Sequence, residues 1–184
     1  YTTLFRSLYC KLPFGKLHRG NPRIMELADH LGRTPSSVAM KLTNLASLDP
    51  EITSSGRKGL RGSSKADRAI FDEFYADTES LADVSEEAWD RIVTGDDALS
   101  LVQPLTDVTE VERTVRARRV QRFFRDSLLI NYERRCAVSR IAVPELLNAS
   151  HIIPWAKDAK RRADPRNGIL LCSIYDRAFD RGLM

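Results

Sequence analysis

Four polar residues in the last third of the chain have the types and spacing that hydrolytic chemistry needs: His151, Asn167, Asp176 and Asp180. An imidazole is neutral near physiological pH and can take a proton from water. Asp176 and Asp180 are four residues apart, which places both carboxylates on one face of a helix. Paired carboxylate oxygens suit Mg²⁺ or Mn²⁺. These residues therefore predict a small metal-dependent site.

The surrounding sequence indicates which elements position these side chains. We predict a strand over 146–153, a second strand over 167–172 and a helix over 173–181. Asn167 and Gly168 form a typical turn pair that can also start the second strand. The expected layout is strand, loop, strand and helix.

Three segments in this region resemble the HNH endonucleases of the ββα-metal (His-Me finger) fold, in particular their restriction-type branch. The segments are Ala149-Ser150-His151-Ile152-Ile153-Pro154-Trp155, Pro165-Arg166-Asn167-Gly168 and Asp176-Arg177-Ala178-Phe179-Asp180-Arg181-Gly182-Leu183. The resemblance covers about residues 108–184. It implies a nuclease module that hydrolyses phosphodiester bonds in double-stranded DNA with a divalent metal.

The resemblance also implies a role for each residue. His151 is expected to be the general base, and Asn167 to fix the loop and orient that base. Asp176, nine positions after Asn167, is expected to hold Mg²⁺ or Mn²⁺, with Asp180 as a further ligand. The structural alternatives are a satisfied buried histidine, a plain Asn-Gly turn, and an Asp180 that caps the helix or pairs with an arginine.

Some positions depart from the family pattern. Relatives often have Asp or His where this chain has Ser150, and His where it has Tyr175, which favours a modest metal affinity. A DNA-binding regulator with a degenerate HNH module is therefore the alternative function. Cys136 and Cys172 each keep one cysteine of the CxxC pairs that some relatives use. Because two thiolates cannot close a tetrahedral site, no structural zinc is expected.

Charge is distributed unevenly along the chain, although the net charge is only +4. Residues 1–65 carry 11 Lys and Arg against 4 Asp and Glu, residues 66–112 carry 2 against 14, and residues 113–184 carry 16 against 7. The two basic blocks are candidate nucleic-acid surfaces, because neutralising phosphates releases condensed counterions. Alternatively, they are solvated surface that holds both ends against the acidic middle.

The segment 21–45 has the pattern of two short amphipathic helices. Asn21 and Thr34 are placed as N-caps, and a short turn containing Gly32 separates the helices. This is the helix-turn-helix pattern, whose second helix presents its N-terminal residues to base edges. The candidate DNA contacts are Arg33, Ser36, Ser37 and Lys41. A plain helical hairpin or a protein-interaction domain is the alternative.

Between these two regions we expect a basic loop over 51–64, acidic helices over 65–81 and 85–93, and a linker over 94–107. A long helix is predicted over 109–132, whose arginines either follow a DNA backbone or form a solvated face beside the acidic block. Further candidate phosphate contacts lie near the predicted site: Lys157, Arg161, Arg162, Arg177 and Arg181.

The sequence thus predicts an α+β protein with a mainly helical N-terminal part. We expect a basic helical domain over 1–64, an acidic segment and linker over 65–107, and the nuclease module over 108–184. No apolar run approaches the roughly 18 residues of a membrane span, so we expect a cytoplasmic protein without a membrane partner. Because one such site cuts one strand, a homodimer is plausible.

Overall fold

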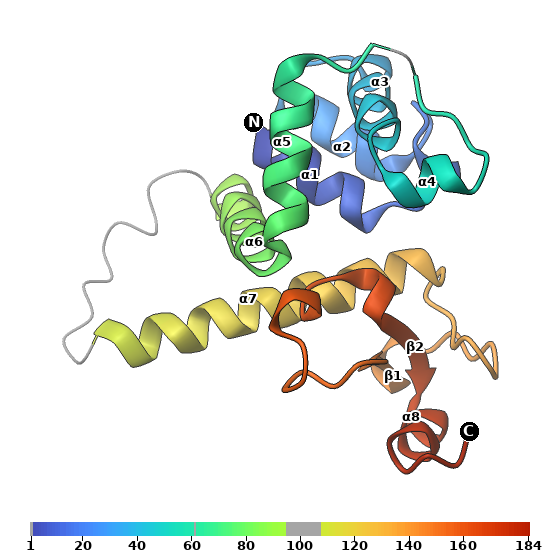
Figure 1. Cartoon of the computed structure of the whole chain (residues 1–184). Coiled ribbons are helices and arrows are strands. Elements are labelled where there is room, and N and C mark those ends of the chain that lie inside the picture. The colour runs from blue at the N-terminus through green and yellow to red at the C-terminus, as the bar shows by residue number, and fades with distance from the viewer. Residues whose placement is uncertain (1, 61, 95–107) are drawn as a thin grey trace.

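The computed structural model describes residues 2–60, 62–94 and 108–184, so nearly all of the linker predicted over 94–107 lies outside the described residues. The described chain is mostly helical with one small antiparallel sheet, which is an α+β architecture (Figure 1). The helices are α1 (Thr2–Lys11), α2 (Pro22–His30), α3 (Pro35–Ala46), α4 (Pro50–Ser54), α5 (Lys65–Ala76), α6 (Thr78–Thr94), α7 (Val108–Asn131) and α8 (Ser173–Asp180). The strands are β1 (Leu147–His151) and β2 (Gly168–Cys172).

Helices α2 and α3 begin at the two caps that the sequence predicts. The Asn21 side chain accepts a hydrogen bond from the Arg23 N–H at 2.9 Å, and the Thr34 hydroxyl accepts one from the Ser37 N–H at 3.3 Å. Gly32 has a φ of +58°, a left-handed conformation that glycine adopts without strain. The connection is therefore fixed by local chemistry at both of its ends.

The first ten residues of the described chain form α1, a helix that was not predicted. Leu4, Phe5 and Leu8 of α1 are buried against α2 and α3. Their partners in this N-terminal core are Ile24, Leu27, Ala28, Val38, Ala39, Leu42 and Ala46. Trp89 and Ile92 of α6 also pack on it, so the acidic helix is part of the same core.

The boundary between the two acidic helices is earlier than predicted. Helix α5 ends at Ala76 and α6 begins at Thr78, so the predicted ranges 65–81 and 85–93 are wrong at that junction. The reason is Asp77, whose carboxylate accepts hydrogen bonds from the Ser80 N–H at 2.9 Å and the Ser80 hydroxyl at 2.5 Å. These bonds cap α6 and hold the pKa of Asp77 below its usual value.

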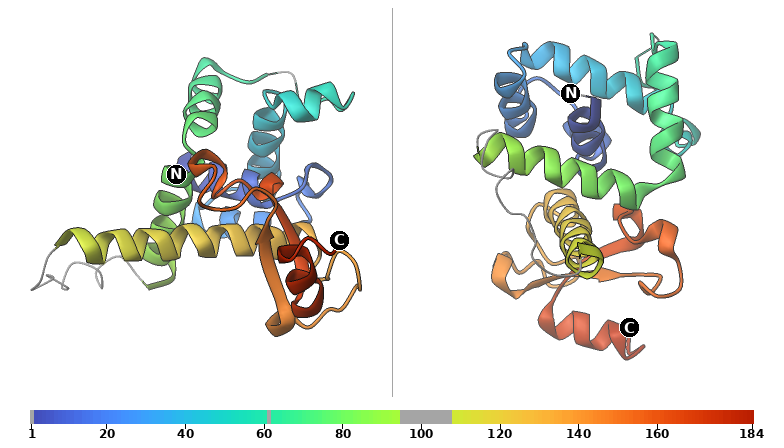
Figure 2. Two further views of the ribbon diagram at one scale, coloured as in Figure 1. Left: turned by 60° about the horizontal axis from the view of Figure 1, so that its bottom comes forward. Right: turned by 90° about the vertical axis from the view of Figure 1, so that its left-hand side faces the viewer.

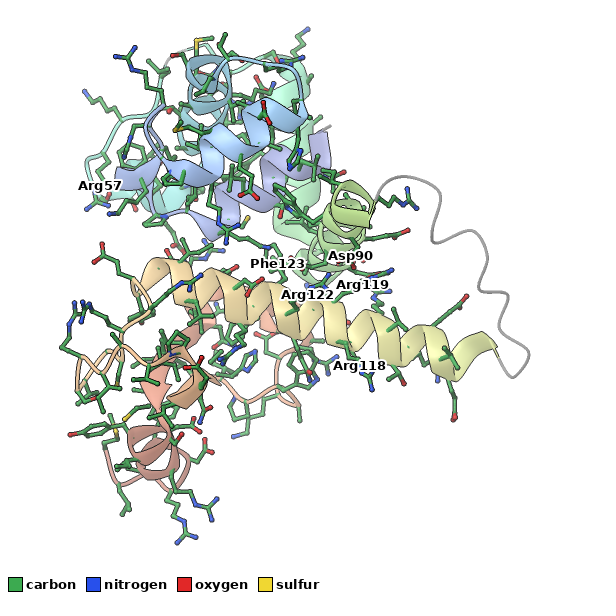
Figure 3. All side chains as sticks on the ribbon, turned by 180° about the vertical axis from the view of Figure 1, so that it is seen from behind. Arg57, Asp90, Arg118, Arg119, Arg122 and Phe123 are labelled. Atoms are coloured by element: carbon green, nitrogen blue, oxygen red, sulfur yellow. The ribbon has the colours of Figure 1, made fainter. Side chains whose placement is uncertain are left out.

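Three arginines of α7 face the acidic side of α6. Arg122 pairs with Asp90 at 2.8 Å (Figure 3). It also pairs with Glu86 at 2.5 Å, and Arg119 pairs with Asp83 at 3.2 Å. The pKa of Arg122 is raised by its hydrogen bond to Asp90 and by its contacts with Glu86, although burial lowers it. Arg116 adds weaker pairs with Glu79 and Asp83, both at 3.9 Å. These arginines therefore lie beside the acidic block, which is the second of the two alternatives given for them above.

Helix α7 lies between the N-terminal helices and the C-terminal module (Figures 1 and 2). On the module side, Phe124 and Leu128 pack against the sheet, with Cys136, Leu147, Leu170, Leu171 and Cys172 in the same core. Arg125 donates to the Leu147 carbonyl at 2.6 Å and so ties β1 to α7. No described helix combines the length and the apolar character that a membrane span requires.

Candidate active site

Strands β1 and β2 pair antiparallel and place His151 and Asn167 at one end of the sheet, whereas α8 follows the other end, after Cys172. His151 ends β1 and pairs in register with Gly168, which begins β2. A Cβ at position 168 would lie 2.6 Å from Phe124 and 2.7 Å from Leu128, so only glycine lets α7 approach the sheet this closely. Helix α8 follows β2 directly and completes a strand, strand and helix unit.

The imidazole of His151 is held between two aromatic rings. It stacks on Phe124 of α7 with ring centroids 3.9 Å apart and planes 6° apart, and Trp155 meets it edge-on at 5.5 Å. Its Nε2 lies 2.9 Å from the carbonyl oxygen of Arg162. Since a carbonyl can only accept, Nε2 is the donor, and in the neutral ring Nδ1 keeps its lone pair free to take a proton.

Asn167 is buried and ties the segment after His151 to the start of β2. Its Oδ1 accepts from the Ile153 N–H at 2.8 Å, and its Nδ2 donates to the carbonyls of Ile153 at 3.1 Å and Arg161 at 3.2 Å. Both ends of the loop that encloses His151 are therefore fastened to one amide. This geometry suits the predicted role of Asn167 in orienting the base.

Asp176, in the first turn of α8, faces β1. Its carboxylate accepts hydrogen bonds from the Ser150 hydroxyl and, at 2.7 Å, from the Asn148 side chain. Because side chains alternate along a strand, Asn148 and Ser150 share one face of β1 and His151 lies on the other. Asn148 was not among the predicted site residues, although its position two residues before Ser150 is a signal for this shared face.

Asp180 is not drawn into this cluster. It is exposed at the last residue of α8 and forms no ion pair with any described residue, so the structure gives no support for an arginine partner. Among the described residues, no three His, Cys, Asp or Glu side chains come together as a metal-binding group. The oxygen donors that do converge are those of Asp176, Ser150 and Asn148, and oxygen is the ligand that Mg²⁺ and Mn²⁺ prefer.

Cys136 and Cys172 lie together in the C-terminal core behind the site. The Cys136 sulfur accepts from the Cys172 N–H at 3.2 Å and the Ser139 N–H at 3.4 Å, while the Ser139 hydroxyl lies 3.6 Å from the Cys172 sulfur. Burial raises the pKa of Cys136, but the hydrogen bonds from Ser139 and the backbone lower it to about 6. Tyr175 of α8 packs on this core.

The basic residues predicted to contact phosphate around the site differ in their exposure and in their contacts with the rest of the protein. Lys157, Arg177 and Arg181 are exposed, and Arg161 is exposed with an ion pair to Asp158 at 3.6 Å. Arg162 is not free, since its Nε donates to the Trp155 carbonyl at 2.9 Å and its guanidinium lies 5.1 Å above the Trp155 ring. Arg162 therefore stabilises the loop between β1 and β2 by contacting Trp155.

The residues predicted to contact DNA from α3 also divide into two groups. Arg33, in the turn before α3, and Ser36, in its first turn, are exposed, and Ser37 is half-buried. Lys41 instead hydrogen-bonds Asp67, the buried carboxylate that completes the cap of α5 with Ser64. Burial raises the pKa of Asp67, but the hydrogen bonds from Lys41 and Ser64 outweigh burial and leave the pKa below its usual value.

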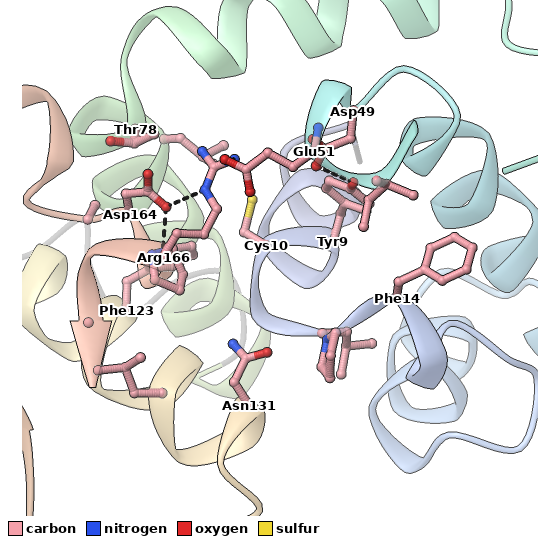
Figure 4. A pocket seen from close by; sticks show the side chains of 18 of the residues that line it. Tyr9, Cys10, Phe14, Asp49, Glu51, Thr78, Phe123, Asn131, Asp164 and Arg166 are labelled. Carbon is pink, nitrogen blue, oxygen red and sulfur yellow. Dashed lines mark hydrogen bonds and ion pairs between the residues drawn. The ribbon is translucent and has the colours of Figure 1, made fainter. Parts of the chain in front are cut away.

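A cavity of about 510 Å³ lies between the N-terminal helices and the C-terminal module (Figure 4). Tyr9, Cys10 and Glu51 line one side, and Asp164 and Arg166 line the other. Arg166 bridges the two sides, with Asp164 at 2.8 Å and Glu51 at 2.9 Å. The lining includes neither His151 nor Asp176, although Ile152 and Gly168 beside His151 belong to it.

Comparison with known protein families agrees with the geometry of the module. Residues 136–184 match the family model of the HNH endonucleases, and α7 lies outside the matched range. The match confirms the resemblance to HNH endonucleases for the C-terminal module and indicates a nuclease domain. Searches of curated proteins and of solved structures gave no match.

Proposed function

We propose that the C-terminal module hydrolyses phosphodiester bonds in double-stranded DNA, with His151 as the general base. The observation that carries this proposal is the fixed imidazole, whose Nε2 donates to the Arg162 carbonyl and whose Nδ1 is left free, within a segment that matches the HNH endonucleases. A base in this state can take a proton from the attacking water. Asn167 holds the loop that supplies the Arg162 carbonyl.

A divalent cation, either Mg²⁺ or Mn²⁺, fits this proposal. Asp176 would hold the ion, with the Ser150 hydroxyl and the Asn148 amide beside it. A carboxylate has about four lone-pair positions, so Asp176 keeps free positions after accepting from both neighbours. Such an ion supplies a Lewis acid that stabilises negative charge on the phosphate. Exposed Lys157, Arg161, Arg177 and Arg181 would contact the DNA backbone.

A plasmid-nicking assay with Mg²⁺ or Mn²⁺ tests the proposal. The wild type is expected to nick supercoiled plasmid and His151→Ala to lose nearly all of this activity. Persistent nicking by His151→Ala would overturn the assignment of the base. Absence of nicking by both proteins would favour the alternative, a DNA-binding regulator with a degenerate HNH module, which Ser150 and Tyr175 make reasonable.

We also propose that α2 and α3 act as a helix-turn-helix and that the N-terminal end of α3 contacts DNA. Exposed Arg33 and Ser36, in a region of the chain that carries a net positive charge, support this assignment. Two copies of the single site would be needed for a double-strand break, so we further propose a homodimer in a restriction or phage-defence role.

Salt dependence of DNA binding tests the N-terminal assignment. Arg33→Ala is expected to weaken binding and to reduce the slope of log K against log salt by about 1, because one phosphate contact is lost. Arg91→Ala is the matched control, since Arg91 lies on α6 and pairs with Glu87. An unchanged slope in Arg33→Ala would favour a protein-interaction role for this part of the chain.

A further inference from the structure

The loop that follows His151 rests on the first turn of α6. The Thr78 hydroxyl donates to the Lys160 carbonyl at 2.7 Å, and the Glu79 carboxylate lies 3.6 Å from the Arg162 guanidinium. Ala163 is fully buried in a cluster with Ala82 of α6 and Phe123 of α7. The acidic helix therefore holds this loop by a hydrogen bond, an ion pair and apolar packing.

Arg162 connects α6 to the base through two different parts of one residue. Its side chain reaches Glu79, the Trp155 carbonyl and the face of the Trp155 ring. Its backbone carbonyl accepts the Nε2 proton of His151. Holding the side chain therefore also restricts the carbonyl that selects the imidazole tautomer.

We propose that Glu79 is a positioning residue for His151, acting through Arg162 from the helical N-terminal part of the chain. This inference rests on the proposed function, in which His151 is the general base. Only the tautomer with the proton on Nε2 leaves Nδ1 able to accept a proton. Glu79 favours that tautomer because the negative charge of Glu79 keeps the Arg162 side chain over the Trp155 ring. In this position the Arg162 carbonyl faces Nε2 of His151.

Because it is partly buried, the ion pair between Glu79 and Arg162 is screened less by solvent than a fully exposed pair would be. The side chains of Glu79 and Arg162 are 26% and 27% exposed, and Arg116 approaches the same carboxylate at 3.9 Å. Neutralising Glu79 leaves both arginines without this partner and frees the Arg162 side chain to leave Trp155. The Arg162 carbonyl then loses a restraint, and the competing tautomer becomes populated.

The test compares full-length Glu79→Gln with full-length Glu87→Gln. Glu87 lies on the same helix and pairs with Arg91 and Arg119, but not with the loop. ¹⁵N NMR of the His151 ring, at a pH where the imidazole is neutral, reports the tautomer directly. We expect mostly Nε2–H in the wild type and Glu87→Gln, and a clear Nδ1–H fraction in Glu79→Gln.

Nicking kinetics of the same proteins supply the second measurement. We expect Glu79→Gln to lower kcat about fivefold with little change in KM, because the exposed phosphate contacts are untouched. Glu79→Asp, which keeps the charge, is expected to recover part of the loss. Thr78→Val, which removes only the bond to Lys160, provides a second variant if Glu79→Gln does not fold.

The outcomes separate this inference from the proposed function. An unchanged tautomer ratio in Glu79→Gln, or an equal change in Glu87→Gln, would overturn the role of Glu79 even if nicking fell. A tautomer shift with no nicking by any of the proteins would support the coupling of Glu79 to His151 and reject the nuclease function.

Discussion

Ser150 and His151 are neighbours in β1, but their side chains lie on opposite faces of the strand. The Ser150 hydroxyl donates to Asp176 on α8, whereas the His151 ring stacks on Phe124 of α7. The candidate metal ligand Asp176 thus belongs to α8, whereas the candidate base His151 packs against α7.

The metal ligand is tested by Asp176→Asn and Asp180→Asn. We expect Asp176→Asn to raise the Mn²⁺ concentration for half-maximal nicking about tenfold or more, since even indirect partners of a metal have effects of that size. Asp180→Asn should change it less than about twofold, because its carboxylate is exposed and outside the cluster. Equal losses would make Asp180 a second ligand, as the sequence predicts.

Asn167→Ala should destabilise the module as well as abolish activity. The substitution leaves the Ile153 N–H and the carbonyls of Ile153 and Arg161 without their side-chain partner. We expect a loss of about 3 kcal/mol in the free energy of unfolding, measured with urea. The control is Asn131→Ala, which removes a single bond to the Ser127 carbonyl and should cost about 1 kcal/mol.

Gly168→Ala should push α7 away from the sheet. The new methyl group would lie within 3 Å of Phe124 and Leu128, and we expect about 1–3 kcal/mol of destabilisation by overpacking. Because Phe124 also stacks on His151, nicking should fall even under conditions in which the variant stays folded. Gly15→Ala has open space around its Cβ and should leave the melting temperature within about 2 °C.

Glu86 should contribute much more to stability than Asp90, although both pair with Arg122. Glu86 is buried and also pairs with Lys11 at 2.5 Å, so Glu86→Gln leaves a buried lysine facing a neutral group. We expect Glu86→Gln to cost about 3 kcal/mol and Asp90→Asn less than about 1 kcal/mol. Similar values in urea unfolding would contradict the importance of burial at this contact.

The cap of α6 should make stability depend on pH in acid. Since the Ser80 hydroxyl and N–H lower the pKa of folded Asp77, this contribution is fully present above the unfolded value of about 3.9. It is lost as the pH falls through the lower folded pKa. The difference in unfolding free energy between wild type and Asp77→Asn should therefore shrink below about pH 4. A constant difference would mean that Asp77 acts without its charge.

Local sequence determined the elements and most of the candidate site. The caps at Asn21 and Thr34, and the two strands and helix around His151 and Asn167, follow from patterns a few residues long, because capping and strand alternation are local effects. Asp176, by contrast, was selected because the resemblance to HNH endonucleases implies a metal ligand nine positions after Asn167. The helix boundary at Asp77 was missed because Asp77, Asp83 and Ser85 are all N-cap residue types, so the segment offers several possible starts for a helix.

Only the tertiary structure decided which charges are available. In sequence, Arg162 and Lys41 resemble the exposed basic residues near them. In the structure, Arg162 contacts Glu79 and Trp155, and Lys41 pairs with Asp67. The contact of Phe124 with His151 likewise joins residues 27 positions apart. Such pairings depend on how α6 and α7 pack against each other, and no pattern within a single segment encodes that packing.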